Sequence, residues 1–521
     1  MVNGDVDRTL IQALQSPDCY PHAVTDIRLL ETHISWILLA GEFAYKIKKP
    51  VDFGFLDFSS LAKRQFFCHE ELRLNQRFAP GLYLDVISIG GSPHQPVLGG
   101  EPAFEYAVKM QRFAEQDVLE HVLERGELTR QHLQSLAKRL TEFHTDLPPD
   151  TSDAGYGNAD QIAAPARQNF QQLALLLDAC HSERLQDLQA ASEAEFQRCQ
   201  LLFEQRQQTG KVRECHGDLH LGNIVLLGCQ PTLFDGIEFN PGLRWIDVIN
   251  DLAFLLMDLQ HRQRPDLAFA CLDAYLQVSG DYAGLSVLRF YLGYRALVMA
   301  KVSAIRAKQL GGPVDLTQCE GYLRLAEQIY LPVKPALIIT YGLPGCGKTS
   351  VSQIVLEKYQ AIRLRSDVER KRLFGLSAEQ NSDSAITGGI YTPEATQRTY
   401  QHLLDVSRQI LQSGFSVIVD AAFLKLSERE SFRQLADQLH VPFAIVAINV
   451  DESLQRQRLV ERQHDASEAD LIVLEKLKLA CEPLNDAEQS YLVRITNNQT
   501  IDDIATQTDA WNRLGSLILV E

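Results

Sequence analysis

The segment CHGDLHLGNIVLL, which starts at Cys215, sets polar side chains directly before an apolar run. Asp218 and Asn223 stand five residues apart in it, and Asp235 follows a second short apolar stretch, TLF. A carboxylate in such a loop can orient a hydroxyl group and accept its proton. An amide oxygen and a further carboxylate are ligands that Mg²⁺ prefers. We therefore predict Asp218 as a catalytic base and Asn223 and Asp235 as metal ligands, brought together by a turn at Gly228.

A predicted strand upstream could supply the cation that such a site needs. In FAYKIKKP, strict alternation puts Ala44, Lys46 and Lys48 on one face. A small residue there can lie against an adenine, and the ammonium group that follows can bind phosphates. We choose Lys46 for this role, with Lys48 as the alternative. The segment FFCHEELRLNQRF is predicted to be a helix whose Glu71, with Glu70 as the alternative, pairs with that lysine.

Three other polar residues of this part of the chain are assigned structural roles. His216 is expected to be a hydrogen-bonded loop histidine rather than a catalytic group. Asp247 and Asp251, in RWIDVINDLAF, are expected to be helix caps or loop anchors rather than metal ligands.

The segments HGDLHLGNI and LFDGIEF resemble the aminoglycoside-phosphotransferase-like branch of the protein-kinase fold. The resemblance implies ATP and Mg²⁺ as cofactors, Asp218 as base, and Asn223 and Asp235 as magnesium ligands. It also implies that the segment around AVKMQRF contacts the adenine. No glycine-rich loop precedes Lys46, so the turn in LLETHISW is expected to cover the phosphates.

A second phosphate-binding pattern, GLPGCGKTS, follows an apolar strand and opens a helix. It matches G-x-x-x-x-G-K-[ST], in which backbone N–H groups surround the phosphates, the lysine reaches the outer phosphates and the threonine hydroxyl binds magnesium. The predicted nucleotide contacts are Gly342, Gly345, Gly347, Lys348, Thr349 and Ser350, with Thr349 also a metal ligand.

Two carboxylates end the strands that would neighbour this loop. Asp367 could face the transferred phosphate and deprotonate an acceptor hydroxyl. Alternatively, Ser366 and Glu369 form a capping box, and Asp367 only favours the first helical turn. Asp420 ends SVIVD, where a carboxylate can bind magnesium through water or simply be a polar strand end.

RLRSDVERKRLFG and QRLVERQHDASEAD resemble small P-loop kinases of the zeta-toxin and polynucleotide-kinase-like kind. That resemblance implies Asp367 as base, and Arg370, Arg458 and Arg462 as phosphate contacts. The last two lie four residues apart on one helix face, which could close as a lid or be solvated. The whole chain resembles bacterial two-domain fusions of an aminoglycoside-phosphotransferase-like protein with a P-loop kinase. This does not make the acceptor an aminoglycoside.

The elements that must position these residues follow from the apolar patterning. Residues from about 24 to 110 are strand-rich, with a hairpin turned at Gly41-Glu42, and the chain is then mostly helical to about Gln328. After Pro335, the strand candidates ALIITY, AIRLR, SVIVD, FAIVAINV and YLVRIT alternate with helices, which indicates a parallel sheet.

The predicted fold is therefore an α+β, protein-kinase-like bilobal domain followed by an α/β P-loop domain. The first domain is expected at 1–331, with a small lobe at about 24–110 and a large lobe at about 116–331. The second is expected at 332–521, since Pro332 and Pro335 interrupt a helical pattern just before an apolar strand.

Composition limits the cellular setting. The chain has 521 residues, which favours two or three domains. Its ten cysteines form no C-x-x-C pair, no apolar run reaches membrane-spanning length, and its start has no secretory-signal pattern, so we expect a cytoplasmic protein. The net charge is −17, and both halves are acidic, which disfavours general binding to nucleic acids or anionic membranes.

Together these patterns predict an ATP- and Mg²⁺-dependent phosphotransferase with two nucleotide sites, which transfers γ-phosphoryl groups to small-molecule hydroxyl acceptors. In the alternative, one domain is catalytic and the other is a nucleotide-sensing regulatory module or an ATPase. A nucleic-acid end kinase is disfavoured by the acidic charge. The sequence leaves the acceptors and the oligomeric state open, because substrate pockets have no portable signature.

Overall fold

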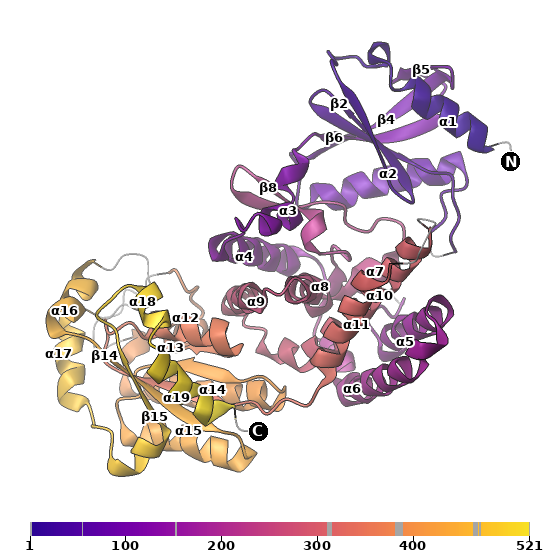
Figure 1. Cartoon of the computed structure of the whole chain (residues 1–521). Helices are drawn as coiled ribbons and strands as arrows, with labels where there is room; N and C mark the ends of the chain where they lie inside the picture. The colour runs from indigo at the N-terminus through magenta and orange to yellow at the C-terminus, as the bar shows by residue number, and fades with distance from the viewer. Residues whose placement is uncertain are drawn as a thin grey trace. The chain divides into compact units, whose positions relative to one another are not determined.

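The computed structural model describes residues 3–54, 56–151, 154–309, 315–380, 389–461, 467 and 470–519 (Figure 1). The chain forms two compact units. The first comprises Met1–Pro165 and Phe203–Asp258, and the second comprises Ala166–Leu202 and Leu259–Glu521. The predicted limits of 1–331 and 332–521 stay a prediction. None of the helices in the described part of the chain is long and apolar enough to cross a membrane.

The small lobe in the first unit is a six-stranded antiparallel sheet in the order β1-β2-β3-β6-β4-β5. Its strands are β1 (Ile27–Glu31), β2 (Ser35–Ala40), β3 (Phe43–Lys48), β4 (Tyr83–Ser92), β5 (Gln95–Leu98) and β6 (Glu105–Gln111). Ala40 pairs with Phe43, which confirms the hairpin turned at Gly41-Glu42. Helix α1 (Asn3–Ala13) precedes the sheet, and α2 (Leu61–Gln76) packs against β4 and β6 (Figure 1).

Alternation along β3 sets the two faces of this lobe. Tyr45 and Ile47 belong to a hydrophobic core with Leu38 and Ala40 of β2. The lysines of β3 therefore lie on the opposite face. The α2 helix begins after Ser60, whose hydroxyl accepts a hydrogen bond from the Lys63 backbone N–H, as an N-cap residue does.

The rest of the first unit carries the catalytic-loop segment between short strands and helices. The helices are α3 (Leu119–Glu124), α4 (Arg130–Asp146), the start of α5 (Ala159–Leu176), the end of α6 (Ser182–Gln208), α7 (Pro241–Arg244) and most of α8 (Val248–His261). The strands are β7 (Val212–Glu214), β8 (Ile224–Leu227), β9 (Gln230–Leu233) and β10 (Trp245–Asp247). Strands β8 and β9 form the predicted hairpin, and the Phe234 N–H donates to the Asn223 carbonyl at 3.0 Å. The hairpin thus returns the chain to the loop.

The second unit contains a parallel sheet of five strands in the order β12-β13-β11-β14-β15. These are β11 (Leu337–Tyr341), β12 (Ile362–Arg365), β13 (Val417–Asp420), β14 (Phe443–Asn449) and β15 (Leu492–Thr496), so all five predicted strands are confirmed. The helices that follow them in the chain are α12 (Lys348–Tyr359), α13 (Ser366–Leu373), α14 (Pro393–Gln412), α15 (Leu426–Leu439), α16 (Glu452–Glu461), α17 (Leu471–Ala480), α18 (Ile501–Ala505) and α19 (Thr508–Ile518). Ile338, Val446 and Trp511 belong to one core between the sheet and its helices.

The second unit also takes in most of α5 and α6 and, before the predicted boundary, the whole of α9 (Pro265–Ser279), α10 (Leu285–Gln309) and α11 (Thr317–Tyr330). Helix α9 packs against α12 and β12. The guanidinium of Arg363 on β12 forms a buried ion pair with Asp273 on α9 at 2.5 Å, and its Nη1 donates to the Thr349 carbonyl at 3.3 Å. The start of the P-loop helix is therefore packed against α9.

The fold is thus an α+β protein-kinase-like domain followed by an α/β P-loop domain with a parallel sheet, as the sequence predicts.

Candidate active sites

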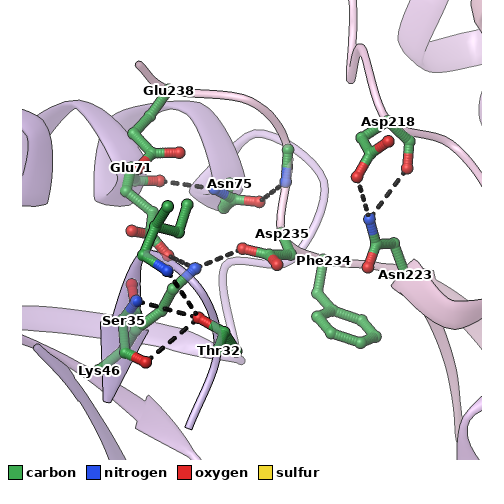
Figure 2. Close-up of polar contacts among 12 residues, drawn as sticks. Thr32, Ser35, Lys46, Glu71, Asn75, Asp218, Asn223, Phe234, Asp235 and Glu238 are labelled. Atoms are coloured by element: carbon green, nitrogen blue, oxygen red, sulfur yellow. Dashed lines mark hydrogen bonds and ion pairs between the residues drawn. The ribbon is translucent and has the colours of Figure 1, made fainter. Parts of the chain in front are cut away.

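In the first unit, Lys46 and Lys48 both contact one buried carboxylate, that of Glu71. Figure 2 shows Lys46 between Glu71 and Asp235. Lys46 Nζ lies 2.8 Å from Oε1 of Glu71, and Lys48 Nζ lies 2.6 Å from Oε2 of the same residue. Lys46 also pairs with Asp235, whereas Lys48 pairs with Glu238. The two lysines proposed as alternatives therefore share Glu71 and differ in their second partner.

Glu70, the alternative to Glu71, has a different set of contacts. Its carboxylate lies 2.6 Å from Arg73 and 2.8 Å from Arg244.

Electrostatics keep Lys46 and Glu71 charged. Burial alone would lower the pKa of Lys46, but Asp235 and Glu71 outweigh burial and hold that pKa well above its ordinary value. Burial would raise the pKa of Glu71, but the two lysines lower it to about 2. Burial raises the pKa of Glu238 despite its contact with Lys48. The Lys46 side chain is 9% exposed and that of Lys48 is fully buried, so Lys46 is the lysine that a ligand can reach.

Asp235 has a strained backbone that the small lobe holds in place. Its φ is +61°, which costs an ordinary residue about 1–3 kcal/mol. The Asp235 N–H donates to the Tyr83 hydroxyl at 2.9 Å, and the Gly236 N–H donates to Oδ1 of Asn75 at 2.8 Å. Sequence reasoning missed Tyr83 and Asn75, because no local pattern marks residues that hold a loop more than 150 positions away.

The candidate base and metal ligand of the catalytic loop contact each other. Nδ2 of Asn223 donates to both the backbone carbonyl and Oδ2 of Asp218, each at 3.0 Å. Figure 2 shows the amide oxygen of Asn223 on the opposite side, turned away from Asp218. The Asp218 side chain is 38% exposed. An exposed carboxylate beside an amide oxygen fits the predicted roles of base and metal ligand, which stay predictions.

His216 and Asp251 fix this loop through buried hydrogen bonds. Nε2 of His216 bonds the Phe234 carbonyl at 2.8 Å, and burial lowers the pKa of His216, so the ring is neutral. Asp251 accepts the N–H groups of His216 at 3.2 Å and Gly217 at 2.8 Å. Asp247 likewise accepts the Ile249 N–H at 2.8 Å. These contacts agree with the structural roles expected for all three residues.

The oxygen atoms around the loop suit Mg²⁺. Asn223 offers an amide oxygen, and Asp235 offers a carboxylate whose side chain is 43% exposed. Hard oxygen donors are the ligands of magnesium in phosphate-transfer sites. The segment AVKMQRF lies in β6 and just beyond it, and the Phe113 ring packs 5.0 Å from that of Phe234. The turn of LLETHISW joins β1 to β2, where Ser35 pairs with Lys48.

The second candidate site starts at the P-loop between β11 and α12. Gly347 has a φ of +89°, and a Cβ there would lie 1.8 Å from Nδ2 of Asn497, so only glycine fits. Lys348 Nζ donates to the carbonyls of Gly342 at 3.0 Å and Leu343 at 3.1 Å. The lysine thus lies over its own loop, where phosphates would bind.

The P-loop lines a cavity of about 1300 Å³. Its volume exceeds the usual range for one ligand, about 300–1,000 Å³, and so allows a nucleotide together with a small acceptor. The predicted residues that line it are Gly345, Gly347, Lys348, Thr349, Ser350, Asp367, Arg370, Asp420 and Arg458. Gly342 contacts Lys348 instead, and Arg462 lies outside the described residues.

Asp367 lies in the first turn of α13, where a carboxylate favours the helix N-terminus as the alternative expected, but the predicted capping box of Ser366 and Glu369 is wrong. The helix begins at Ser366 with Arg365 as its N-cap, so Ser366 is not the cap. The Glu369 carboxylate instead pairs with Arg372 and lies 3.0 Å from Nε2 of His402. Asp367 lines the cavity, and its role as a base stays a prediction.

The remaining cavity residues have defined partners. Asp420 is nearly buried and accepts a hydrogen bond from Oγ of Ser352 at 3.2 Å. Arg370 donates to the Ile390 carbonyl at 3.0 Å. Nη2 of Arg458 lies 3.3 Å from Oδ1 of Asn497. The Thr349 hydroxyl and the Asp420 carboxylate are oxygen donors of the kind that magnesium takes, and their metal role stays a prediction.

Some known proteins match most of this chain, and others match only its C-terminal part. The uncharacterized protein Rv2004c of Mycobacterium tuberculosis (strain ATCC 25618 / H37Rv) is 30% identical over 455 residues, which cover 87% of this chain and 90% of that protein. The chain belongs to the Rv2004c family. The likeness therefore extends over most of the chain and is not confined to its C-terminal part.

The C-terminal part also matches more widely. A family model described as an AAA domain matches residues 337–484. Adenylate kinase of a Nitratiruptor species is 24% identical over 191 residues, 34% of this chain and 94% of that enzyme. Both matches agree with the P-loop domain seen in this member of the Rv2004c family.

Solved structures resemble each part at low identity. A choline/ethanolamine kinase family protein from Mesorhizobium loti covers 62% of this chain and 94% of its own, at 12% identity and a TM-score of 0.38. A gluconokinase from Sinorhizobium meliloti 1021 covers 36% of this chain and 95% of its own, at 20% identity and a TM-score of 0.26.

Proposed function

We propose that the chain is an ATP- and Mg²⁺-dependent phosphotransferase with two nucleotide sites, each of which transfers a γ-phosphoryl group to a hydroxyl of a small molecule. The observation that carries the proposal is the meeting of Lys46, Glu71 and Asp235, which come from a strand, a helix and a loop far apart in the chain. With Asp218 and Asn223 they make a complete set of groups for phosphoryl transfer.

In the first site, each group has a defined task. Lys46, held by Glu71, binds the phosphates, and Asp218 orients the acceptor hydroxyl and accepts its proton. The acceptor oxygen forms a bond to the γ-phosphorus as the bond from that phosphorus to the β–γ bridging oxygen breaks, which leaves ADP. Asn223 and Asp235 would hold Mg²⁺, which neutralises phosphate charge when bound.

In the second site, the P-loop and its neighbouring residues bind the phosphates and accept the proton. The N–H groups of the P-loop and the ammonium of Lys348 bind the phosphates. Asp367 accepts the proton of the acceptor hydroxyl. Thr349 and Asp420 would hold the metal ion, which again supplies positive charge at the phosphates. The cavity of about 1300 Å³ at the carboxyl ends of β11, β12 and β13 supports binding of both substrates.

The test uses the full chain with Mg-ATP and a cell metabolite extract, and mass spectrometry detects new phosphorylated species. Wild type is compared with Asp218→Asn, Lys348→Ala and the double variant. We expect one set of products to disappear with Asp218→Asn and another with Lys348→Ala. Products that survive in the double variant, or an extract that gains none, would contradict the proposal. Products that depend on one site only would favour a regulatory or ATPase role for the other half.

A further inference from the structure

The catalytic loop contains a histidine for which the proposed reaction has no use. His220 follows Asp218 by two residues and is the N-cap of the short 3-10 turn Leu221–Asn223. Its ring packs on Phe254 of α8, with 5.4 Å between ring centroids, and its side chain is 25% exposed. The ring is therefore fixed beside the candidate base.

The hydrogen bonds of the ring determine which nitrogen carries hydrogen. Nδ1 of His220 accepts the Gly222 backbone N–H at 3.1 Å. A neutral imidazole has one N–H, so that hydrogen is on Nε2. Nε2 lies 3.6 Å from Oδ2 of Asp218. A protonated ring also carries hydrogen on Nε2, so in both states the ring presents a donor to the carboxylate and cannot take a proton from it there.

We propose that His220 is a positioning residue whose Nε2–H donates to Oδ2 of Asp218 during phosphoryl transfer. This deepens the role of the first site and rests on the proposed function. Nδ2 of Asn223 already donates to the same oxygen at 3.0 Å. Two donors on Oδ2 fix the rotation of the carboxylate, so that it faces the acceptor hydroxyl in one orientation.

The separation of 3.6 Å is longer than a hydrogen bond. Catalytic hydrogen bonds are often this long before substrate binds and shorten in the Michaelis complex. The surroundings favour a donor at this position. Asp258 on α8 accepts the Leu221 N–H at 2.9 Å. Burial alone would lower the pKa of His220, but Asp218, Asp258 and Glu120 raise it. The ring is thus placed among carboxylates.

Two variants separate positioning from capping. In His220→Asn, the short amide can reach the Nδ1 position and keep the cap on Gly222, but it has no group at the Nε2 position. In His220→Gln, the longer amide can place an N–H near the Nε2 position but gives up the cap. Both are made in full-length protein that carries Lys348→Ala, so that the P-loop site is silent. The probe is Mg-ATP alone, with water as the acceptor, and kcat and KM are measured.

We expect His220→Asn to lower kcat about tenfold or more, with KM for ATP changed less than about twofold, because a donor to the base acts on the transferring group and not on ATP binding. His220→Gln should keep most of kcat. A larger loss in His220→Gln, equal losses, or no loss in either variant would overturn the proposal.

A second measurement is independent of turnover. Nitrogen-15 NMR of the histidine rings reports which nitrogen is protonated, and the His220 signals are assigned by their loss in His220→Gln. We expect Nε2–H, and a change in the Nε2 shift in Asp218→Asn. A ring protonated only on Nδ1, or one that does not respond to Asp218→Asn, would overturn the proposal. If no hydrolysis depends on Asp218, the proposed function of this site fails, and the NMR result still decides the hydrogen bond.

Discussion

Replacing Lys48 and Lys46 in turn by methionine should separate a structural lysine from a phosphate-binding one. Lys48→Met keeps side-chain length but removes the cation 2.6 Å from Oε2 of Glu71. It also leaves Glu238, whose side chain is 4% exposed, without its ion-pair partner. Uncompensated buried charge costs about 3–5 kcal/mol. Lys48→Met should therefore destabilise the first unit by about that amount.

Lys46→Met should cost less stability than Lys48→Met but should abolish the activity of the first site. Glu71 keeps Lys48, and Asp235 is 43% exposed, so water can solvate it. The expected loss of stability is about 1–3 kcal/mol, the range for hydrogen bonds to charged groups. Phosphoryl transfer by the first site should nevertheless be lost, because Lys46 is the lysine proposed to bind the phosphates.

Hydrogen exchange measured by mass spectrometry suits a chain of two compact units, because it resolves each segment and does not require a two-state transition. Peptides that cover β3 and α2 should lose protection in Lys48→Met far more than in Lys46→Met, and peptides of the parallel sheet serve as the internal control. The double variant Lys48→Met/Glu238→Gln should recover part of the loss, since it removes the orphaned charge. Equal loss of protection in the two single variants would refute the separation of roles.

Three further perturbations have outcomes set by the same contacts. The pKa of Glu71 is lowered from 4.5 to about 2. The ionised Glu71 carboxylate therefore contributes fully to stability above about pH 4.5, and this contribution disappears as the pH falls toward 2. In Glu71→Gln, the free energy of unfolding should depend less steeply on pH in this window. Asp273→Asn should destabilise the second unit by about 3–5 kcal/mol, because it leaves Arg363 buried without its carboxylate. The control Asp266→Asn removes an exposed ion pair on the same helix and should cost less than about 1 kcal/mol. Hydrogen exchange in α9 and β12 measures both. Lys348→Ala should weaken ATP binding at the P-loop about 10- to 100-fold and AMP binding least, and calorimetry that finds equal losses for ATP and AMP would show that the lysine is structural.

Local patterns predicted the strands and the phosphate loop, because both are encoded in short segments. Apolar runs of strand length bounded by turn residues are sufficient to mark β11 to β15. Alternation in β3 is sufficient to put Lys46 and Lys48 on one face, but it cannot tell which of the two is placed to bind phosphates. That distinction depends on Asp235 and Glu238, which lie 189 and 190 positions further along the chain.

Tertiary contacts explain the rest of what the sequence did not predict. The capping-box spacing of Ser366 and Glu369 is real, but the helix begins one residue earlier than that motif needs, and Glu369 is drawn into pairs with Arg372 and His402. The buried pair of Asp273 and Arg363 joins residues 90 positions apart. Such pairs have no local signature, so only the folded chain reveals them.

The proposed function requires two independent nucleotide sites on one chain. Calorimetry of the intact protein with the non-hydrolysable analogue Mg-AMPPNP tests it most directly. We expect two binding events in wild type, one of which Lys348→Ala weakens about 10- to 100-fold while Lys46→Met weakens the other. A single binding event in wild type, or one variant that abolishes both, would contradict it.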